Sequence, residues 1–279
     1  MGVLTTRAGL LQNMASGKGV TMPFLGLAPG NVTAGVAASG FMTAGFNFNA
    51  LGTNQSLILP PALAGPARLT SVMMTNSQAR CLYLARAYLI GTLSPTATGD
   101  RFTHDTATFP LLRTVFGAAS TAITLLPMIR VTTATTTTAA IFTIKNAGST
   151  TGYTNQAGTT VVGTKTFTMP NVATALGSAF VLRLEEGDSG VRDIASINVG
   201  TAAAAGACDV LGVELLGLLP MHLASGAAIA DYVYGTLSPA DLKPATATSG
   251  TVTSNLVVIC VGTTTGATSL GHIQAVIDV

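Results

Sequence analysis

The chain has 279 residues, of which 13 are Lys or Arg and 11 are Asp or Glu, so its net charge is +2. Charged residues make up 9% of the chain and hydrophobic residues 48%, whereas about a quarter of an ordinary soluble domain is charged. This composition excludes an intrinsically disordered chain, and the absence of basic clusters argues against a nucleic-acid partner.

The first 40 residues differ from the rest because they are rich in Gly and Pro, as in Gly-Lys-Gly, Met-Pro and Ala-Pro-Gly. These residues predict an extended N-terminal arm over 1–40, followed by the main domain over 41–279. Short helices are expected at Arg7–Met14 and Asp105–Arg113. With 3 Glu and 4 Lys in the chain, long helices stabilised by ion pairs are excluded.

Short runs rich in β-branched residues recur along the chain, separated by Gly, Pro, Asn and Thr. Such regular spacing predicts an all-β, antiparallel β-sandwich of the jelly-roll type. The expected strands are Phe41–Phe48, Arg68–Met74, Arg80–Ile90, Ile123–Val131, Ala139–Lys145, Val161–Met169, Ala179–Leu184, Val191–Val199, Val210–Leu216, Ile229–Tyr234, Asn255–Val261 and His272–Val279.

One sequence echo raises the question of two related lobes. Tyr88–Pro95 (YLIGTLSP) reappears as Tyr232–Pro239 (YVYGTLSP). A duplication would put a lobe boundary near 145–158, whereas the same turn chemistry in a Gly- and Thr-rich chain would produce the echo without one.

The sequence offers no membrane span, cofactor motif or zinc site. Its uncharged stretches are interrupted by Pro and Gly before they reach the length of a spanning helix, and the N-terminus lacks the apolar core of a signal peptide. No phosphate-binding loop is present. Cys81, Cys208 and Cys260 lie far apart and without ligand spacing, so buried free thiols are expected.

The segment Gly187-Asp188-Ser189-Gly190 resembles the nucleophile loop of chymotrypsin-like serine proteases. This resemblance would make Ser189 a nucleophile, with His104 as the upstream histidine that such an enzyme needs. Two features depart from the family's pattern. His104 lies in Phe-Thr-His-Asp, which is not the family's setting for this histidine, and Val191 replaces the family's usual second glycine after the serine. A polar turn between two strands also explains these residues, and that interpretation is preferred.

The same region holds the chain's acidic concentration. Four acidic residues gather there and could offer oxygen ligands to calcium, although their spacing matches no EF-hand. The favoured interpretation is a solvated surface loop or a polar contact with another subunit, formed by Glu185, Glu186, Asp188, Arg192 and Asp193.

So few charges leave Thr, Ser, Gly, Ala and apolar residues to cover the surface. Large apolar surfaces usually belong to interfaces, so a homo-oligomer is expected. The predicted contact residues are Phe24 and Leu27 of the arm together with the Glu185–Asp193 turn. No catalytic, cofactor-binding or metal-binding residue is expected.

Three segments resemble structural proteins of tailed-bacteriophage virions: Tyr88–Phe116, Leu184–Asn198 and Ala275–Val279. The resemblance implies a non-enzymatic protein located in the virion, a capsid decoration, cement or minor head protein. Its partners would be copies of itself and the major capsid protein or other virion proteins. The alternative within this class is a neck or tail protein of the virion. A cell-surface adhesin is a hypothesis from another class, and it would need an export signal.

Overall fold

The computed structural model describes residues 6–28, 67–76, 80–104, 125–133, 140–145, 148, 150–169, 179–221, 227–231, 247–249, 252–260 and 267–277. Within them every strand pairing is antiparallel. This confirms the predicted all-β antiparallel sandwich. No helix in the described part of the chain has the length and apolarity needed to cross a membrane.

The chain enters the fold through a short helix and a long strand. Thr6 caps helix α1 (Arg7–Asn13) by accepting the Gly9 N–H at 3.1 Å, and a π-helical turn, η1 (Met14–Lys18), follows. The turn leads into β1 (Gly19–Ala28) through Gly17, whose φ of +79° suits glycine. The helix prediction is therefore confirmed. The described part of the predicted arm is extended, but β1 pairs along its length with β17 (Ala267–Ile277) of the same chain.

The described strands form four sheets. The first contains β1, β17, β2 (Ala67–Asn76) and β14 (Ala227–Asp231) in that order. The second contains β10 (Ala179–Val181), β5 (Leu126–Thr133), β13 (Ala207–Met221), β3 (Arg80–Leu93), β16 (Val252–Cys260) and β15 (Ala247–Ser249). The third contains β11 (Val191–Ile194), β7 (Tyr153–Asn155) and β8 (Thr160–Val161). The fourth contains β4 (Gly99–Thr103), β12 (Ser196–Thr201), β6 (Ile141–Thr143) and β9 (Thr166–Thr168).

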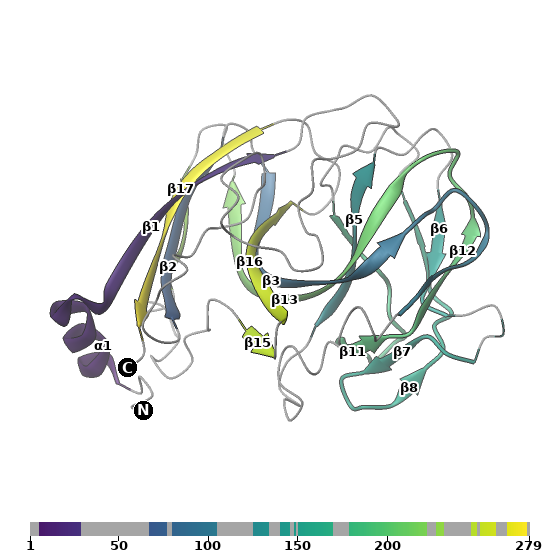
Figure 1. Cartoon of the computed structure of the whole chain (residues 1–279), viewed down its shortest axis with the longest axis horizontal. Coiled ribbons are helices and arrows are strands. Elements are labelled where there is room, and N and C mark those ends of the chain that lie inside the picture. The colour runs from purple at the N-terminus through teal and green to yellow at the C-terminus, as the bar shows by residue number, and fades with distance from the viewer. Residues whose placement is uncertain are drawn as a thin grey trace.

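Figure 1 shows how these sheets are arranged along the long axis of the molecule. The first sheet and α1 lie at one end, and the small sheets of β6, β7, β8, β11 and β12 lie at the other. The long strands β3 and β13 run between them, so the second sheet joins the two ends.

The main hydrophobic core lies between the second sheet and the two small sheets. Its buried residues include Ile90, Ile129, Phe142, Tyr153 and Ile197. Alternate residues of β5 and β13 face this core, as expected for strands with period two.

Three phenylalanines connect the fourth sheet to the edge of the second. The Phe167 ring centroid lies 6.4 Å from that of Phe142 and 5.5 Å from that of Phe180. These residues belong to β6, β9 and β10, so aromatic contacts span the gap between the two sheets.

Each predicted strand that the structure describes overlaps an observed strand, but the bounds differ: Ala139–Lys145 shortens to β6 and Ala179–Leu184 to β10, and two predicted strands are divided. Val161–Met169 splits into β8 and β9, and Val191–Val199 splits at Ala195 into β11 and β12. Four strands were not predicted: β1, β4, β7 and β15. Three predicted features lie outside the described residues: the strand Phe41–Phe48, the helix Asp105–Arg113 and the second copy of the echo, Tyr232–Pro239.

Backbone crowding explains two glycines near the predicted lobe boundary. A Cβ on Gly152 would lie 2.3 Å from the Ile144 carbonyl oxygen and 2.6 Å from that of Val161, and one on Gly163 would lie 2.7 Å from the Ile144 oxygen. Only glycine fits where these backbone segments cross. The segment 150–158 also contributes Tyr153 to the core.

Candidate functional site

The Glu185–Asp193 turn connects β10 to β11 and is the charged site that the sequence predicts. Its tip is a tight turn in which the Asp188 N–H donates to the Glu185 carbonyl oxygen at 3.1 Å. Gly187 adopts a φ of +91°, and a Cβ built on it would meet no atom within 4 Å. The tip therefore projects into open space, and Glu186, Gly187 and Ser189 are exposed there.

The Asp188 carboxylate is held by two side chains of β7. The Tyr153 hydroxyl donates to Oδ2 at 2.5 Å, and the Asn155 amide nitrogen donates to Oδ1 at 2.8 Å. The Tyr153 hydroxyl in turn accepts the Glu185 N–H at 3.0 Å. Burial, and then the hydrogen bond to Asp188, raise the pKa of Tyr153 to about 12, so its hydroxyl remains protonated at neutral pH.

The Glu185 carboxylate organises the loop between β8 and β9. Its Oε1 accepts hydrogen bonds from the Thr164 N–H, from the Thr164 hydroxyl at 2.9 Å and from the Lys165 N–H at 3.1 Å. These hydrogen bonds hold the pKa of Glu185 below its usual value, and the bond from the Thr164 N–H has the largest effect. The carboxylate thus serves as a structural acceptor.

Gln156, in the loop after β7, bonds to the turn from the other side. Its Oε1 accepts the Ser189 N–H at 3.1 Å, and its Nε2 donates to the Gly187 carbonyl oxygen at 3.4 Å. Arg192 donates through Nε to the Gln156 carbonyl oxygen at 3.1 Å. The turn and the β7–β8 hairpin therefore form one hydrogen-bonded unit, which we call the turn platform: residues 153–165 and 185–192.

The structure brings together only part of the predicted contact set. Glu185, Asp188 and Arg192 belong to the turn platform, and Glu186 lies at its exposed tip. Asp193 was expected in a solvated loop, and this expectation is wrong, because its side chain is only 7% exposed on β11. A bulge at Arg192 separates Asp193 from the preceding paired residue and redirects the strand.

Phe24 and Leu27 lie on β1, where their backbones are opposite Gly271 and Thr268. Figure 1 shows β1 and β11 at opposite ends of the molecule. The two predicted contact regions are therefore separate surfaces. Sequence reasoning missed Tyr153, Asn155 and Gln156, whose only signal was a run of polar residues between glycines.

The hydrogen bonds around Gly187–Gly190 are those of a structural turn. Asp188 is engaged by Tyr153 and Asn155, and Ser189 by Gln156 through its backbone. The His104 ring stacks on Phe102, with a centroid separation of 6.3 Å. Among the described residues, no group of three or more His, Cys, Asp or Glu side chains is placed to hold a metal ion.

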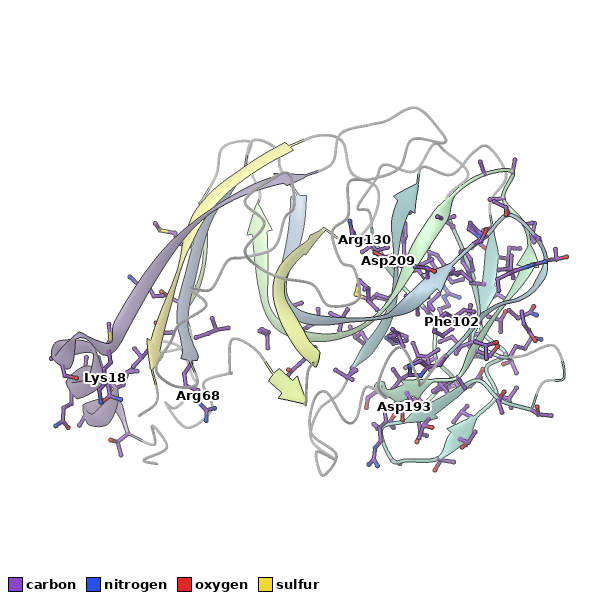
Figure 2. All side chains as sticks on the ribbon, in the orientation of Figure 1. Lys18, Arg68, Phe102, Arg130, Asp193 and Asp209 are labelled. Atoms are coloured by element: carbon purple, nitrogen blue, oxygen red, sulfur yellow. The ribbon has the colours of Figure 1, made fainter. Side chains whose placement is uncertain are left out.

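A buried ion pair lies elsewhere, on the second sheet. Arg130 of β5 and Asp209 of β13 are directly opposite, and Arg130 Nη1 lies 3.1 Å from Asp209 Oδ2 (Figure 2). Both residues are buried: Arg130 is 5% exposed and Asp209 is 4% exposed. Burial outweighs the mutual attraction, raising the pKa of Asp209 to about 6 and lowering that of Arg130 to about 10.

Cys208 is a free buried thiol, as predicted, and burial raises its pKa to about 12. The side chains of Cys81 and Cys260 lie outside the described set.

Comparison with protein-family models, curated proteins and solved structures finds no match to this chain.

Proposed function

We propose that this chain is a non-enzymatic structural subunit of a tailed-phage virion, which assembles as a homo-oligomer and decorates or cements the capsid. The supporting observation is how the turn platform uses its charges. The carboxylates of Glu185 and Asp188 and the guanidinium of Arg192 all bond to neighbouring groups of the same platform.

A site built for acid–base or nucleophilic chemistry keeps reactive groups directed at a place where a substrate can bind. In the turn platform, by contrast, polar groups hold loops in one shape. Rigid loops with few unpaired charges suit binding by shape and burial, because little conformational entropy is lost when the surface is covered.

The composition supports the oligomer. With 24 charged residues in 279, the surface depends on neutral polar and apolar groups, and such surfaces are commonly buried in assemblies. The virion assignment rests on the resemblance of Tyr88–Phe116, Leu184–Asn198 and Ala275–Val279 to phage structural proteins.

The test is to purify the chain and measure its mass by sedimentation velocity over a wide concentration range, at low and at moderate NaCl. We expect a homo-oligomer whose dissociation changes little with salt, because the contacts contain few charges. A monomer at the highest concentration, or dissociation that depends steeply on salt, would contradict the proposal.

Electron microscopy of virions incubated with the labelled chain then tests the location. Label distributed over the head shell supports decoration or cementing. Label confined to a ring at the neck or along the tail contradicts the capsid role and supports the alternative, and absence of binding to any particle contradicts the virion role.

A further inference from the structure

The loop between β8 and β9, residues 162–165, joins two of the described sheets. β8 belongs to the third sheet and β9 to the fourth. The loop is fixed near its start, because the Gly163 N–H donates to the Ile144 carbonyl oxygen at 3.0 Å, and a Cβ on Gly163 would lie 2.7 Å from that oxygen. The next two residues, Thr164 and Lys165, are exposed. The contact that holds these two exposed residues comes from another segment, the turn after β10.

One oxygen atom of Glu185 accepts three hydrogen bonds from this part of the loop. Its Oε1 accepts the Thr164 N–H, the Thr164 hydroxyl at 2.9 Å and the Lys165 N–H at 3.1 Å. Glu185 lies in the turn that follows β10, an edge strand of the second sheet among the described residues. A single carboxylate thus ties the end of the second sheet to the loop between the third and fourth sheets. Figure 1 shows β7, β8 and β11 of the same region together at one end of the molecule.

Three donors that converge on one oxygen require a charged acceptor. An ionised carboxylate only accepts hydrogen bonds, and bonds to it are about twice as strong as those between neutral groups. A protonated carboxyl group loses the negative charge, and one of its oxygens becomes a donor. Protonation of Glu185 therefore weakens all three hydrogen bonds at the same time.

The surrounding groups keep this carboxylate ionised at neutral pH. The titratable residues of the segments around it are Arg183, Glu186 and Asp188 on its own turn, Lys165 on the loop, Lys145 after β6, Tyr153 on β7 and Arg192 on β11. The hydrogen bond from the Thr164 N–H has the largest effect, and with the other two bonds and the charge of Lys165 it holds the pKa of Glu185 below its usual value of 4.5, although burial acts in the opposite direction.

We infer that Glu185 is an acid-released latch, whose protonation frees Thr164 and Lys165 from the turn. Gly163 remains bound to Ile144, so the loop opens beyond Gly163 while the sheets on either side stay folded. This inference goes beyond the proposed function and does not depend on it. Because the folded-state pKa of Glu185 is lowered, the latch stabilises the loop at neutral pH, and this contribution is lost as the pH falls through that pKa, below 4.5.

The bonds that shape the tip of the turn do not involve the Glu185 carboxylate. The Glu185 N–H donates to the Tyr153 hydroxyl, and the Asp188 carboxylate accepts from Tyr153 and Asn155. The tip and the β8–β9 loop are therefore held by different groups. Release of the latch changes the loop side of the turn platform and alters the shape of the surface that the platform presents.

Hydrogen exchange measured by mass spectrometry tests the latch, with each rate divided by that of an unstructured peptide at the same pH. In the wild-type chain we expect protection of a peptide covering 162–168 to fall by about threefold or more between about pH 6 and pH 3. Peptides from β5 and β13 should stay protected. A flat profile for the loop, or an equal loss of protection in β5 and β13, would overturn the inference.

A matched pair of variants then identifies the group responsible. Glu185→Gln imitates the protonated side chain, so we expect it to lower the protection of the loop at pH 7 by a similar factor and to remove the pH dependence. Glu186→Gln removes the adjacent carboxylate and should leave both as in the wild-type chain, with circular dichroism to verify the fold. A Glu185→Gln loop as protected at pH 7 as the wild-type loop, or an acid response that persists in this variant, would overturn the inference. The wild-type profile decides the question without any variant if Glu185→Gln does not fold.

Discussion

Tyr153 and Asp188 are joined by a 2.5 Å hydrogen bond that connects the hydrophobic core to an exposed turn. The Tyr153 ring is 1% exposed and packs in the core, while its hydroxyl lies between the Asp188 carboxylate and the Glu185 N–H. One hydroxyl group therefore connects both the Asp188 side chain and the Glu185 backbone to the core.

Replacing Tyr153 with Phe preserves the ring and removes that hydroxyl. The Glu185 N–H and Asp188 Oδ2 then lose a partner, so we expect the free energy of unfolding to fall by about 1–3 kcal/mol. Denaturant unfolding followed by circular dichroism measures this change. Glu186→Gln, at the exposed tip, is the control and should alter stability by less than about 0.5 kcal/mol. Equal effects of both variants would contradict the role of Tyr153.

Gly91→Ala should destabilise the core by overpacking. A Cβ on Gly91 would lie 2.8 Å from Cε2 of Phe102, whose ring is 4% exposed and has little room to move. We expect a loss of about 1–3 kcal/mol in the same assay. Gly200→Ala is the matched control, because the nearest atom to its Cβ, the Ile141 carbonyl oxygen, is 3.9 Å away. A Gly91→Ala protein as stable as the control would show that Phe102 does not fill this space.

The buried Arg130–Asp209 pair should be costly to break and inexpensive to replace. Arg130→Met leaves a buried carboxylate without its cation, and we expect it to lower stability by about 3–5 kcal/mol. Adding Asp209→Leu removes the remaining charge and should restore most of that loss. If the double variant were no more stable than Arg130→Met, burial of an unpaired charge would not be the cause.

The same pair predicts a pH dependence with a definite sign. The pKa of Asp209 is raised to about 6 in the folded chain, so the folded state binds this proton more tightly than the unfolded state does. Its contribution to stability is therefore largest below about pH 4 and is lost as the pH rises to about 6. The stability of the wild-type chain minus that of Asp209→Asn should fall over this range and then level off. A difference that rises with pH would contradict the raised pKa.

Ser189→Ala should leave the structure unchanged, and a fluorophosphonate probe should not label the wild-type chain. Only the backbone N–H of Ser189 is used in the described contacts of the turn, with Gln156 Oε1. Labelling of the wild-type protein that Ser189→Ala abolishes, measured by mass spectrometry, would revive the protease hypothesis.

The predictable part of the fold is the part with regular alternation or continuous apolar runs. β5 and β13 have β-branched and aliphatic runs that identify strands without knowledge of their partners. β1 was missed because Gly and Pro23 suppress the strand signal, and an edge strand tolerates such residues since one side carries no ladder. β4, β7 and β15 have only three to five residues each, too few to show a period.

The candidate site was only half predictable, for a related reason. The acidic residues after β10 stand out in a charge-poor chain, so Glu185 and Asp188 could be named. Their partner Tyr153 lies 35 residues from Asp188, and no local pattern reveals such a contact. The burial of Asp193 likewise belongs to strand pairing, because Asp193 lies on β11 opposite Thr154 of β7.

The strand order of the first sheet has a consequence for how the chain acquires its structure. β17 lies between β1 and β2 in the described sheet, so two strands from the first third of the sequence both pair with one near residue 270. During synthesis, β1 and β2 cannot pair with β17 until nearly the whole polypeptide has left the ribosome. Such distant pairings slow folding, and the nascent protein would depend on chaperones or rapid closure to protect these waiting segments from aggregation.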